Sequence, residues 1–398
     1  MDVLESFLVA RLPEIRFGSG RVTETADVLS RFGQRALLVT GQRAFTVTPH
    51  WSGLLEKLQA ANVSWEHVRV AEEPTPQLVD DTVARFRDAD IQVVVGIGGG
   101  SVLDAAKAIA GLLITGRSVL DHLEGVGRGV PYTGPAVPLV AIPTTAGTGS
   151  EATKNAVLSE RGVRGYKKSF RHEQLVARVA IVDPRLLVNC PKSLIAANGM
   201  DAFTQLLESY VSANSSPFTD ALAVSGLEAF RDGFWPAWEL EHPDASAGYS
   251  RIAYAALLSG ITLAQAGLGS VHGLASPLGA YFPIPHGVVC GTLVAEATAL
   301  NIRALRQREP DSPALAKYAR VANLLEQRDH ASRDVALDAL ESLLQGWLER
   351  LDLPRLSRFG VTPEDLAPVV ANCRGGSMRT NPLVLSDAEL TALLKSRL

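Results

Sequence analysis

The sequence predicts an α/β N-terminal half, with a parallel Rossmann-like sheet, followed by an all-α C-terminal half. Short apolar, β-branched runs alternate with helical patterns through the first half, and this rhythm is typical of parallel strands joined by helices. After Pro184 such runs disappear, and apolar residues recur at spacings of three and four, as on one face of a helix. The strand-like runs are ALLVT at 36–40, IQVVVGI at 91–97, LVAI at 139–142 and VAIV at 179–182.

Three long segments carry the helical pattern of the second half. They are AFTQLLESYVSA at 202–213, RIAYAALLSGITLAQ at 251–265 and VALDALESLLQGWLERL at 335–351. A boundary near residues 184–192 would separate an α/β domain at 1–185 from a helical domain at 186–398. A chain of 398 residues is long enough for two domains, and a ligand cleft is expected between them.

Composition and charge indicate a soluble globular protein. With 46% hydrophobic residues, 20% charged residues and a net charge of -4, the chain resembles neither a disordered nor a nucleic-acid-binding protein. The N-terminal stretch has early acidic residues and no long apolar core, and no later segment approaches 18 uninterrupted apolar residues. We therefore expect no signal peptide, no membrane partner and a cytoplasmic location.

The three cysteines are scattered through the chain. Cys190, Cys290 and Cys373 are odd in number, and none belongs to a C-x-x-C pair. This spacing argues against a disulfide framework and against a zinc site made of thiolates. A reducing cytoplasm fits it best.

A glycine-rich turn follows the apolar run at 91–97 and precedes a helical pattern. Glycines let a phosphate approach the backbone closely, and a helix N-terminus directs its N–H groups at an anion. Ser101 and Asp104 also have the S-x-x-D spacing of a helix cap. A plain strand-to-helix turn is the alternative, but three consecutive glycines exceed what a turn needs and favour a dinucleotide phosphate site. The turn consists of Gly98, Gly99, Gly100 and Ser101.

A second loop, PTTAGTGSEAT at 143–153, also follows a strand-like run and is rich in glycines and small hydroxyl residues. It either wraps a cofactor from the other side or is an ordinary surface loop. Composition alone leaves both readings open.

Five motifs together resemble the iron-containing (group III) alcohol dehydrogenase family. They occur in the family's order, and the similarity extends from FGSG near residue 17 to the tail NPLVLSDAEL. The resemblance implies a dehydroquinate synthase-like architecture with a dinucleotide-binding domain, a helical domain, a divalent metal in the cleft, and hydride transfer between a nicotinamide and an alcohol or aldehyde. The motifs are GGGSVLDAAK at 98–107, IPTTAGTGSEAT at 142–153, VDP at 182–184, DAFTQ at 201–205 and HGLASPLGAYFPIPHG at 272–287.

Cofactor-binding positions follow from the same resemblance. It implies that Gly98, Gly99 and Ser101 contact the pyrophosphate, and that Lys167 lies near the cofactor and Asn155 near the nicotinamide. The remaining positions, which would line the nucleotide and nicotinamide site, are Asp104, Thr144, Thr145 and Thr148.

The resemblance also implies a metal site at Asp201, Gln205, His272 and His286, where the family commonly has one aspartate and three histidines. In a helix, Asp201 and Gln205 would project from one face because they are four residues apart. A glutamine offers only a neutral amide oxygen, so we expect metal binding to survive but to weaken, most for Fe(II), with Zn(II) or Ni(II) as alternative occupants. Without the resemblance, both histidines would be ordinary buried or turn histidines.

Ser276 replaces a family histidine that lies close to substrate and nicotinamide. The replacement removes a proton shuttle, and Ser276 can substitute for it only by passing a proton through water or the ribose hydroxyls. We therefore expect turnover to peak at a higher pH than in relatives that keep the histidine.

Residues after the first strand-like run bear on cofactor choice. Relatives that use NAD often have an aspartate where this chain has Gly41, and that carboxylate would repel a 2′-phosphate. Arg43, two residues further on, can donate charge-assisted hydrogen bonds to such a phosphate. These residues predict a preference for NADPH, although both are also ordinary turn and surface residues.

The leading functional reading is an NADP-dependent aldehyde reductase or alcohol dehydrogenase that acts as a homodimer or larger homo-oligomer. The alternatives are a metal-free reductase similar to maleylacetate reductases, a lyase similar to dehydroquinate synthase and a catalytically silent subunit. We expect few cationic side chains near the site to hold a dicarboxylate, and the segment at 262–290 contains no Lys or Arg, which disfavours recognition of a sugar phosphate. The pocket wall is expected to be predominantly apolar, which favours an uncharged aldehyde. Candidate contacts in the pocket wall are Phe203, Leu274, Tyr281 and Phe282.

Overall fold

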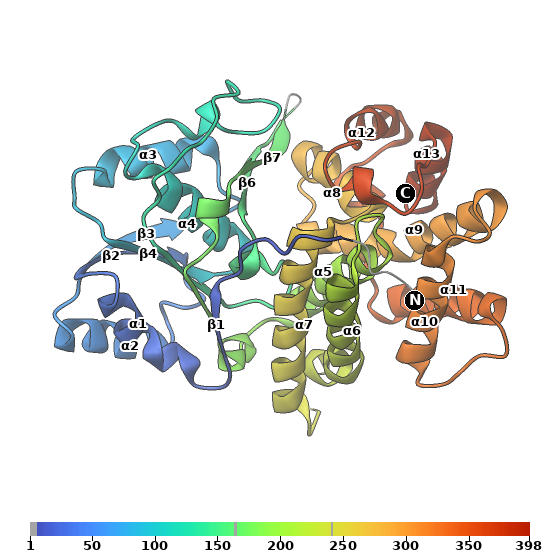
Figure 1. Cartoon of the computed structure of the whole chain (residues 1–398), viewed down its shortest axis with the longest axis horizontal. Helices are drawn as coiled ribbons and strands as arrows, with labels where there is room; N and C mark the ends of the chain where they lie inside the picture. Colours follow the sequence, from blue (N-terminus) through green and yellow to red (C-terminus); the bar gives the residue numbers. More distant parts are fainter. Residues whose placement is uncertain (1–5, 163–164, 240–241) are drawn as a thin grey trace.

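The computed structural model describes residues 6–162, 165–239 and 242–398. The first five residues of the stretch where no signal peptide is expected lie outside the described residues. In Figure 1 the N-terminal half, coloured blue to green, contains the sheet, and the C-terminal half, coloured yellow-green to red, is helical.

A six-stranded parallel sheet forms the N-terminal half, as the sequence predicts. Its strand order is β1-β8-β5-β4-β2-β3, and every pairing within it is parallel. The four apolar runs became β2, β4, β5 and β8, which are buried along nearly their whole length, as parallel strands covered on both faces are. The strands are β1 Glu14–Phe17, β2 Arg35–Gly41, β3 Ser64–Val70, β4 Val93–Gly98, β5 Leu139–Pro143 and β8 Val179–Val182.

Two strands of the sheet and a hairpin were not expected from the sequence. The strands β1 and β3 lie at the two edges and read EIRF and SWEHVRV, so charged residues interrupt the apolar pattern where the strands meet solvent. A separate antiparallel hairpin pairs β6 Asn155–Glu160 with β7 Tyr166–Arg171. The hairpin reaches across to the helical half, where β7 contacts α8 Ser270–Tyr281 (Figure 1).

Helices cover both faces of the sheet. Successive side chains of a strand point to opposite faces, so Leu37 and Val39 pack with α3 and α4 while Ala36 and Leu38 pack with α1 and α2. The helices of this half are α1 Thr25–Ser30, α2 Pro49–Ala60, α3 Pro76–Phe86 and α4 Gly100–Leu112.

The strand order places a topological switch point between β2 and β4. The chain leaves β2 toward β3 at one edge and leaves β4 toward β5 on the opposite side, although β2 and β4 are neighbours. Ligands of open α/β sheets bind in the crevice outside the carboxyl ends of such a strand pair. Gly41 ends β2 and Gly98 ends β4, so this crevice lies beside the glycine-rich turn.

The C-terminal half is helical, as predicted, and the described residues after Val182 contain no strand. Helix α5 lies at its centre, packs against α6, α7 and α9, and is buried along most of its length. The DAFTQ segment falls within α5. The helices are α5 Lys192–Val211, α6 Pro217–Trp238, α7 Ala245–Ala266, α8 Ser270–Tyr281, α9 His286–Arg308, α10 Pro313–Glu326, α11 Arg333–Arg350, α12 Leu366–Asn372 and α13 Asp387–Ser396.

Helix α9 is long and apolar enough to cross a membrane by composition alone. Of its 18-residue apolar window, 78% is buried inside the protein. Helices α7 and α8 pass the same test only as a joined pair, and they meet at a bend of 99°. Burial of this kind is what a core helix shows, because its apolar faces are already covered by neighbouring helices.

Candidate active site

A cavity of about 870 Å³ is lined by residues of both halves. Gly100 and Ser101, at the start of α4, contribute to one part of its wall, and Gln205, His272 and His286 contribute to another. Thr148, residues of the β6–β7 hairpin and a segment near the C-terminus, at 372–380, also line it. The first residues of α4 and three of the four predicted metal ligands, Gln205, His272 and His286, therefore face one common space.

The glycine turn and the threonine loop pack so closely that side chains are excluded from the turn. A Cβ at Gly98 would lie 2.5 Å from Val102, and one at Gly100 would lie 2.8 Å from Thr148 Cγ2. Gly99 faces the Thr145 hydroxyl, 3.2 Å from its would-be Cβ. The backbone N–H of Thr144 donates to the carbonyl of Gly98 at 3.0 Å and ties the two loops together.

The predicted helix cap at Ser101 and Asp104 is wrong. Helix α4 begins at Gly100, its cap residue is Gly99, and no side chain caps it. Asp104 instead accepts a hydrogen bond from the Ser150 hydroxyl at 2.6 Å, because the threonine loop folds back over the helix. The first backbone N–H groups of α4 consequently remain available to an anion.

Lys107 is a buried residue of this region that the sequence reading missed. Its ammonium donates to the Ser150 hydroxyl at 2.6 Å, the Thr153 hydroxyl at 2.8 Å and the Asn155 carbonyl at 2.8 Å. Burial lowers the pKa of Lys107, while the carboxylate of Asp104 opposes that shift. Lys107 therefore joins α4 to the threonine loop and the hairpin, and its place among the apolar positions of that helix was the available signal.

Gly41 and Arg43 lie apart from the cavity wall. A Cβ at Gly41 would sit 3.8 Å from Val102 Cγ2, so Gly41 is next to the first turn of α4, at the switch point. Arg43 is exposed just beyond it. Neither residue lines the cavity, whereas ten other predicted positions do: Gly100, Ser101, Asp104, Thr148, Asn155, Lys167, Gln205, His272, Ser276 and His286.

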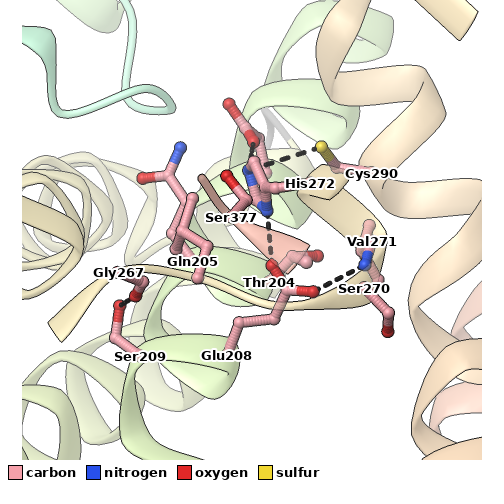
Figure 2. Close-up of polar contacts among 12 residues, drawn as sticks. Thr204, Gln205, Glu208, Ser209, Gly267, Ser270, Val271, His272, Cys290 and Ser377 are labelled. Atoms are coloured by element: carbon pink, nitrogen blue, oxygen red, sulfur yellow. Dashed lines mark hydrogen bonds and ion pairs between the residues drawn. The ribbon is translucent and has the colours of Figure 1, made fainter. Parts of the chain in front are cut away.

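Three of the predicted metal ligands converge at the boundary of α5, α8 and α9. Asp201 Oδ1 lies 3.2 Å from His272 Nε2 and 3.7 Å from His286 Nε2. A fourth group, Cys290, joins them from α9, and one ligand atom from each of the four lies within 4.8 Å of all the others. Figure 2 shows the Cys290 sulfur directed at the His272 ring.

Glu208 fixes the orientation of His272. The Val271 N–H donates to Glu208 Oε1 at 2.7 Å, and His272 Nδ1 lies 2.6 Å from Glu208 Oε2 (Figure 2). A carboxylate only accepts, so Nδ1 carries a proton and the lone pair of neutral His272 is on Nε2. That lone pair faces the Asp201 carboxylate, and two acceptors at this distance require a proton or a metal cation between them.

The electrostatics of the cluster favour a positive charge at His272, whereas burial lowers the pKa of His286 to about 4. Burial would raise the pKa of Asp201, but His286 and His272 bring it down to about 2. Burial would lower the pKa of His272, but Cys290, Glu208 and Asp201 raise it well above its ordinary value. A field that holds a proton here also favours a divalent ion, and the oxygen, nitrogen and sulfur donors fit zinc or iron(II).

Gln205, the fourth predicted ligand, has an engaged amide oxygen. Its Oε1 accepts a hydrogen bond from the Ser259 hydroxyl of α7 at 2.7 Å. Gln205 also lines the cavity, and in Figure 2 it lies on the opposite side of His272 from Cys290.

Ser276 lies at the meeting point of α8 and the hairpin. Its hydroxyl donates to the carbonyl of Lys167 at 3.1 Å, and the Lys167 ammonium donates to Glu73 Oε1 at 2.7 Å. Burial raises the pKa of Glu73, but Lys167 and Ser159 lower it below its ordinary value. An ion pair of Lys167 and Glu73 thus stands at the cavity wall where Ser276 is found.

The candidate pocket contacts Phe203, Leu274, Tyr281 and Phe282 are wrong, since none lines the cavity. Phe203 is fully buried in an aromatic core with Phe230 and Trp347, because its position in α5 turns it away from the metal ligands. The expectation of few cationic side chains near the site is also wrong. Cationic residues reach the wall from outside the segment at 262–290: Lys154, Lys167, Lys168 and Arg171 from the hairpin region and Arg379 near the C-terminus.

Two family descriptions match the chain. The one described as iron-containing alcohol dehydrogenase matches residues 13–184, and the C-terminal part of the Fe-containing alcohol dehydrogenase family matches residues 195–398. Alcohol dehydrogenase 4 from Schizosaccharomyces pombe is 32% identical over 387 residues, which cover 96% of this chain and 86% of that protein.

Two further proteins extend the comparison. The NAD-dependent methanol dehydrogenase of Bacillus methanolicus is 31% identical over 396 residues, covering 97% of this chain and 98% of that protein. The crystal structure of a 1,3-propanediol oxidoreductase superposes with a TM-score of 0.88 at 26% identity and covers 99% of this chain and 100% of its own.

Proposed function

Since this chain belongs to the iron-containing alcohol dehydrogenase family, and is therefore an oxidoreductase of alcohols and aldehydes, we propose that it is an NADPH-preferring aldehyde reductase whose hydride transfer is assisted by a divalent metal. The cavity carries this proposal. It joins an uncapped helix N-terminus, suited to a pyrophosphate, to a converging set of carboxylate and imidazole donors.

Asp201, His272 and His286 would hold the metal. A divalent ion, when bound, polarises the carbonyl oxygen of the substrate, so that hydride transfer needs no strong protein base beside the carbon. Glu208 keeps Nε2 of His272 directed at the ion, as carboxylates behind metal-binding histidines commonly do.

The cofactor would lie along the cavity from the glycine turn to this cluster. The backbone at Gly98, Gly99 and Ser101 would bind the pyrophosphate, with no side chain in the way. Asp104, Thr148, Asn155 and Lys167 line the space that remains for the ribose and the nicotinamide. The packed loops and the Lys107 contacts hold this half of the site rigid.

Preference for NADPH rests on the switch point between β2 and β4. Gly41 presents no carboxylate at the carboxyl end of β2, and Arg43 is exposed beside it, free of any ion pair among the described contacts. The Bacillus relative is named NAD-dependent, so the preference must be measured on this chain. The ratio of kcat/KM for NADPH to that for NADH tests it, and a higher value for NADH would refute it.

The product alkoxide needs a proton. Ser276 is not an acid with a pKa near that of imidazole, so it does not supply this proton as a histidine would. Its hydroxyl is bound to a backbone carbonyl, and Lys167 and Glu73 are the titratable groups beside it. We expect turnover to rise toward higher pH than in relatives with the histidine. An acidic limb governed by a group with a pKa of about 6.5 would contradict this.

The cationic cavity wall supports a second candidate, a metal-free reductase of an acidic carbonyl compound. Lys168, Arg171 and Arg379 could bind its carboxylates. Chelation separates the two candidates. Metal-assisted reduction of aldehydes is lost with EDTA and returns with added Zn(II) or Fe(II), whereas the metal-free enzyme keeps its activity.

A cytoplasmic location and a homodimer remain proposals of the sequence and the family.

A further inference from the structure

Cys290 occupies a ligand position in the metal cluster. Its sulfur lies 3.6 Å from His272 Nε2 and 3.8 Å from His286 Nε2. Metal–ligand lengths of about 2.0–2.1 Å for nitrogen and oxygen and about 2.3 Å for sulfur, in a tetrahedron, place N and O about 3.3 Å apart and N and S about 3.6 Å apart. The four observed separations, 3.2 and 3.7 Å to oxygen and 3.6 and 3.8 Å to sulfur, are close to these values.

Helix α9 presents two of the four ligand groups on one face. His286 and Cys290 are four residues apart, so they lie one above the other on the helix. Cys290 is fully buried and does not line the cavity, whereas Gln205 does. A thiolate would therefore bind the ion from the protein side, and a substrate oxygen would approach from the cavity side, beside Gln205, as a fifth ligand.

We propose that Cys290 is a protein ligand of the metal and takes the place that Gln205 leaves, so that the ion is held by Asp201, His272, His286 and Cys290. This inference rests on the metal site of the proposed function. The ligand set contains two anions and two neutral imidazoles, which balance a divalent charge. The thiol loses its proton to solvent when the sulfur–metal bond forms.

A thiolate ligand changes which metal the site selects. Sulfur is a soft donor that favours zinc over magnesium or manganese, and Fe(II) lies below Zn(II) in the general affinity order. The site should therefore retain zinc in competition with iron. Cys373 illustrates the ordinary alternative for a buried cysteine, because its thiol simply donates to the Val370 carbonyl at 3.1 Å.

X-ray absorption at the zinc edge of the full chain, loaded with one equivalent of Zn(II), tests the assignment. We expect one sulfur scatterer at about 2.3 Å in the wild type, and its loss in both Cys290→Ser and Cys290→Ala. Competition with a chromogenic chelator should show zinc affinity falling by at least about ten- to hundredfold in these variants. Cys373→Ser is the matched control and should keep both the sulfur signal and the affinity, and Gln205→Ala should keep the sulfur signal.

Two results overturn the inference, and they are distinguishable. Zinc retained with only nitrogen and oxygen scatterers would remove Cys290 from the ligand set and leave the metal site itself intact. Failure of the wild type to retain any metal would overturn the metal-assisted function as well. Because Co(II) bound by a thiolate shows a near-ultraviolet charge-transfer band, Co(II) substitution of Cys290→Ser and Cys373→Ser checks the same assignment independently in folded protein.

Discussion

The two ends of the cavity are built in different ways. The nucleotide end is formed by short contiguous segments, the glycine turn and the threonine loop, each directly after a strand. The metal end is assembled from α5, α8 and α9, with Asp201 and His286 85 positions apart in the numbering of the chain. The first end depends on backbone close to strand ends, and the second depends on side chains that only the packing of helices brings together.

This difference matters for how substitutions act. At the nucleotide end a substitution is felt locally, because each glycine faces a particular neighbour, as Gly100 faces Thr148. At the metal end a missing ligand can be supplied from a different helix, as we propose for Cys290 in place of Gln205. The two ends should therefore respond independently to mutation, and the following variants test that independence.

The largest effect is expected for His272→Ala. Loss of a directly binding imidazole leaves Asp201 without its main partner, and metal affinity should fall by more than about a hundredfold, together with aldehyde reduction. Metal content after gel filtration measures metal retention, and the rate of NADPH oxidation measures aldehyde reduction. His330→Ala removes a histidine that contacts Asn323 and Glu326 instead, and it should retain the metal. Equal losses of metal in His272→Ala and His330→Ala would contradict the assignment of His272 as a metal ligand.

A smaller effect at the same end is expected for Glu208→Gln. An amide group facing Nδ1 of His272 would donate to it, which moves the ring proton to Nε2 and opposes metal binding. Zinc affinity should fall about ten- to hundredfold while NADPH binding is unchanged. Chelator competition and NADPH fluorescence titration measure these two quantities. The exposed Glu228→Gln on α6 should change neither, and an unaltered zinc affinity in Glu208→Gln would argue against the role of Glu208.

At the nucleotide end, Gly100→Ala should weaken cofactor binding alone. The new methyl group would lie 2.8 Å from Thr148 Cγ2 and displace the threonine loop. If the overpacking cost of roughly 1–3 kcal/mol falls on the cofactor-bound state, the Kd for NADPH increases by about five- to 150-fold. Gly53→Ala in α2 is the control, because its added Cβ would meet nothing within 4 Å. Metal loss in Gly100→Ala would show that the two ends are coupled.

The smallest change is expected for Arg43→Ala. Removing one charge-assisted hydrogen bond to a 2′-phosphate should raise the KM for NADPH several-fold and leave that for NADH unchanged. Arg87→Ala, at an exposed arginine just after the C-terminal end of α3, serves as the control. Gly41→Asp should shift preference toward NADH, and identical effects of Arg43→Ala on both cofactors would remove Arg43 from the 2′-phosphate site.

The sequence predicts the buried parts of the fold well. Central strands such as β4 are uninterrupted apolar runs because both their faces are covered, whereas the edge strand β3 mixes charges with apolar residues and was missed. The supposed cap at Ser101 failed for a similar reason, since Asp104 bonds to Ser150 of a distant loop. A local sequence pattern does not show which distant residue a side chain contacts in the folded protein.

The candidate site shows the same limit. The positions of Asp201, His272 and His286 came from a family resemblance, and the structure brings them together. Cys290 was read as one of three unpaired cysteines, because a ligand set spread over three helices has no local spacing. Its position four residues after His286 in a helix was the signal that could have identified it. The cationic side chains of the hairpin were missed because they lie far from the histidines in the sequence and only folding brings both to the same cavity.

Metal content of the purified, untagged protein tests the central claim most directly. After anaerobic incubation with Zn(II), Fe(II) or Ni(II) and removal of the excess, plasma mass spectrometry measures what each sample retains. We predict retention of about one ion per chain, zinc above iron, and its loss in His272→Ala. A wild-type protein that retains no metal and still reduces its substrate with NADPH would contradict metal-assisted hydride transfer and favour the metal-free reductase.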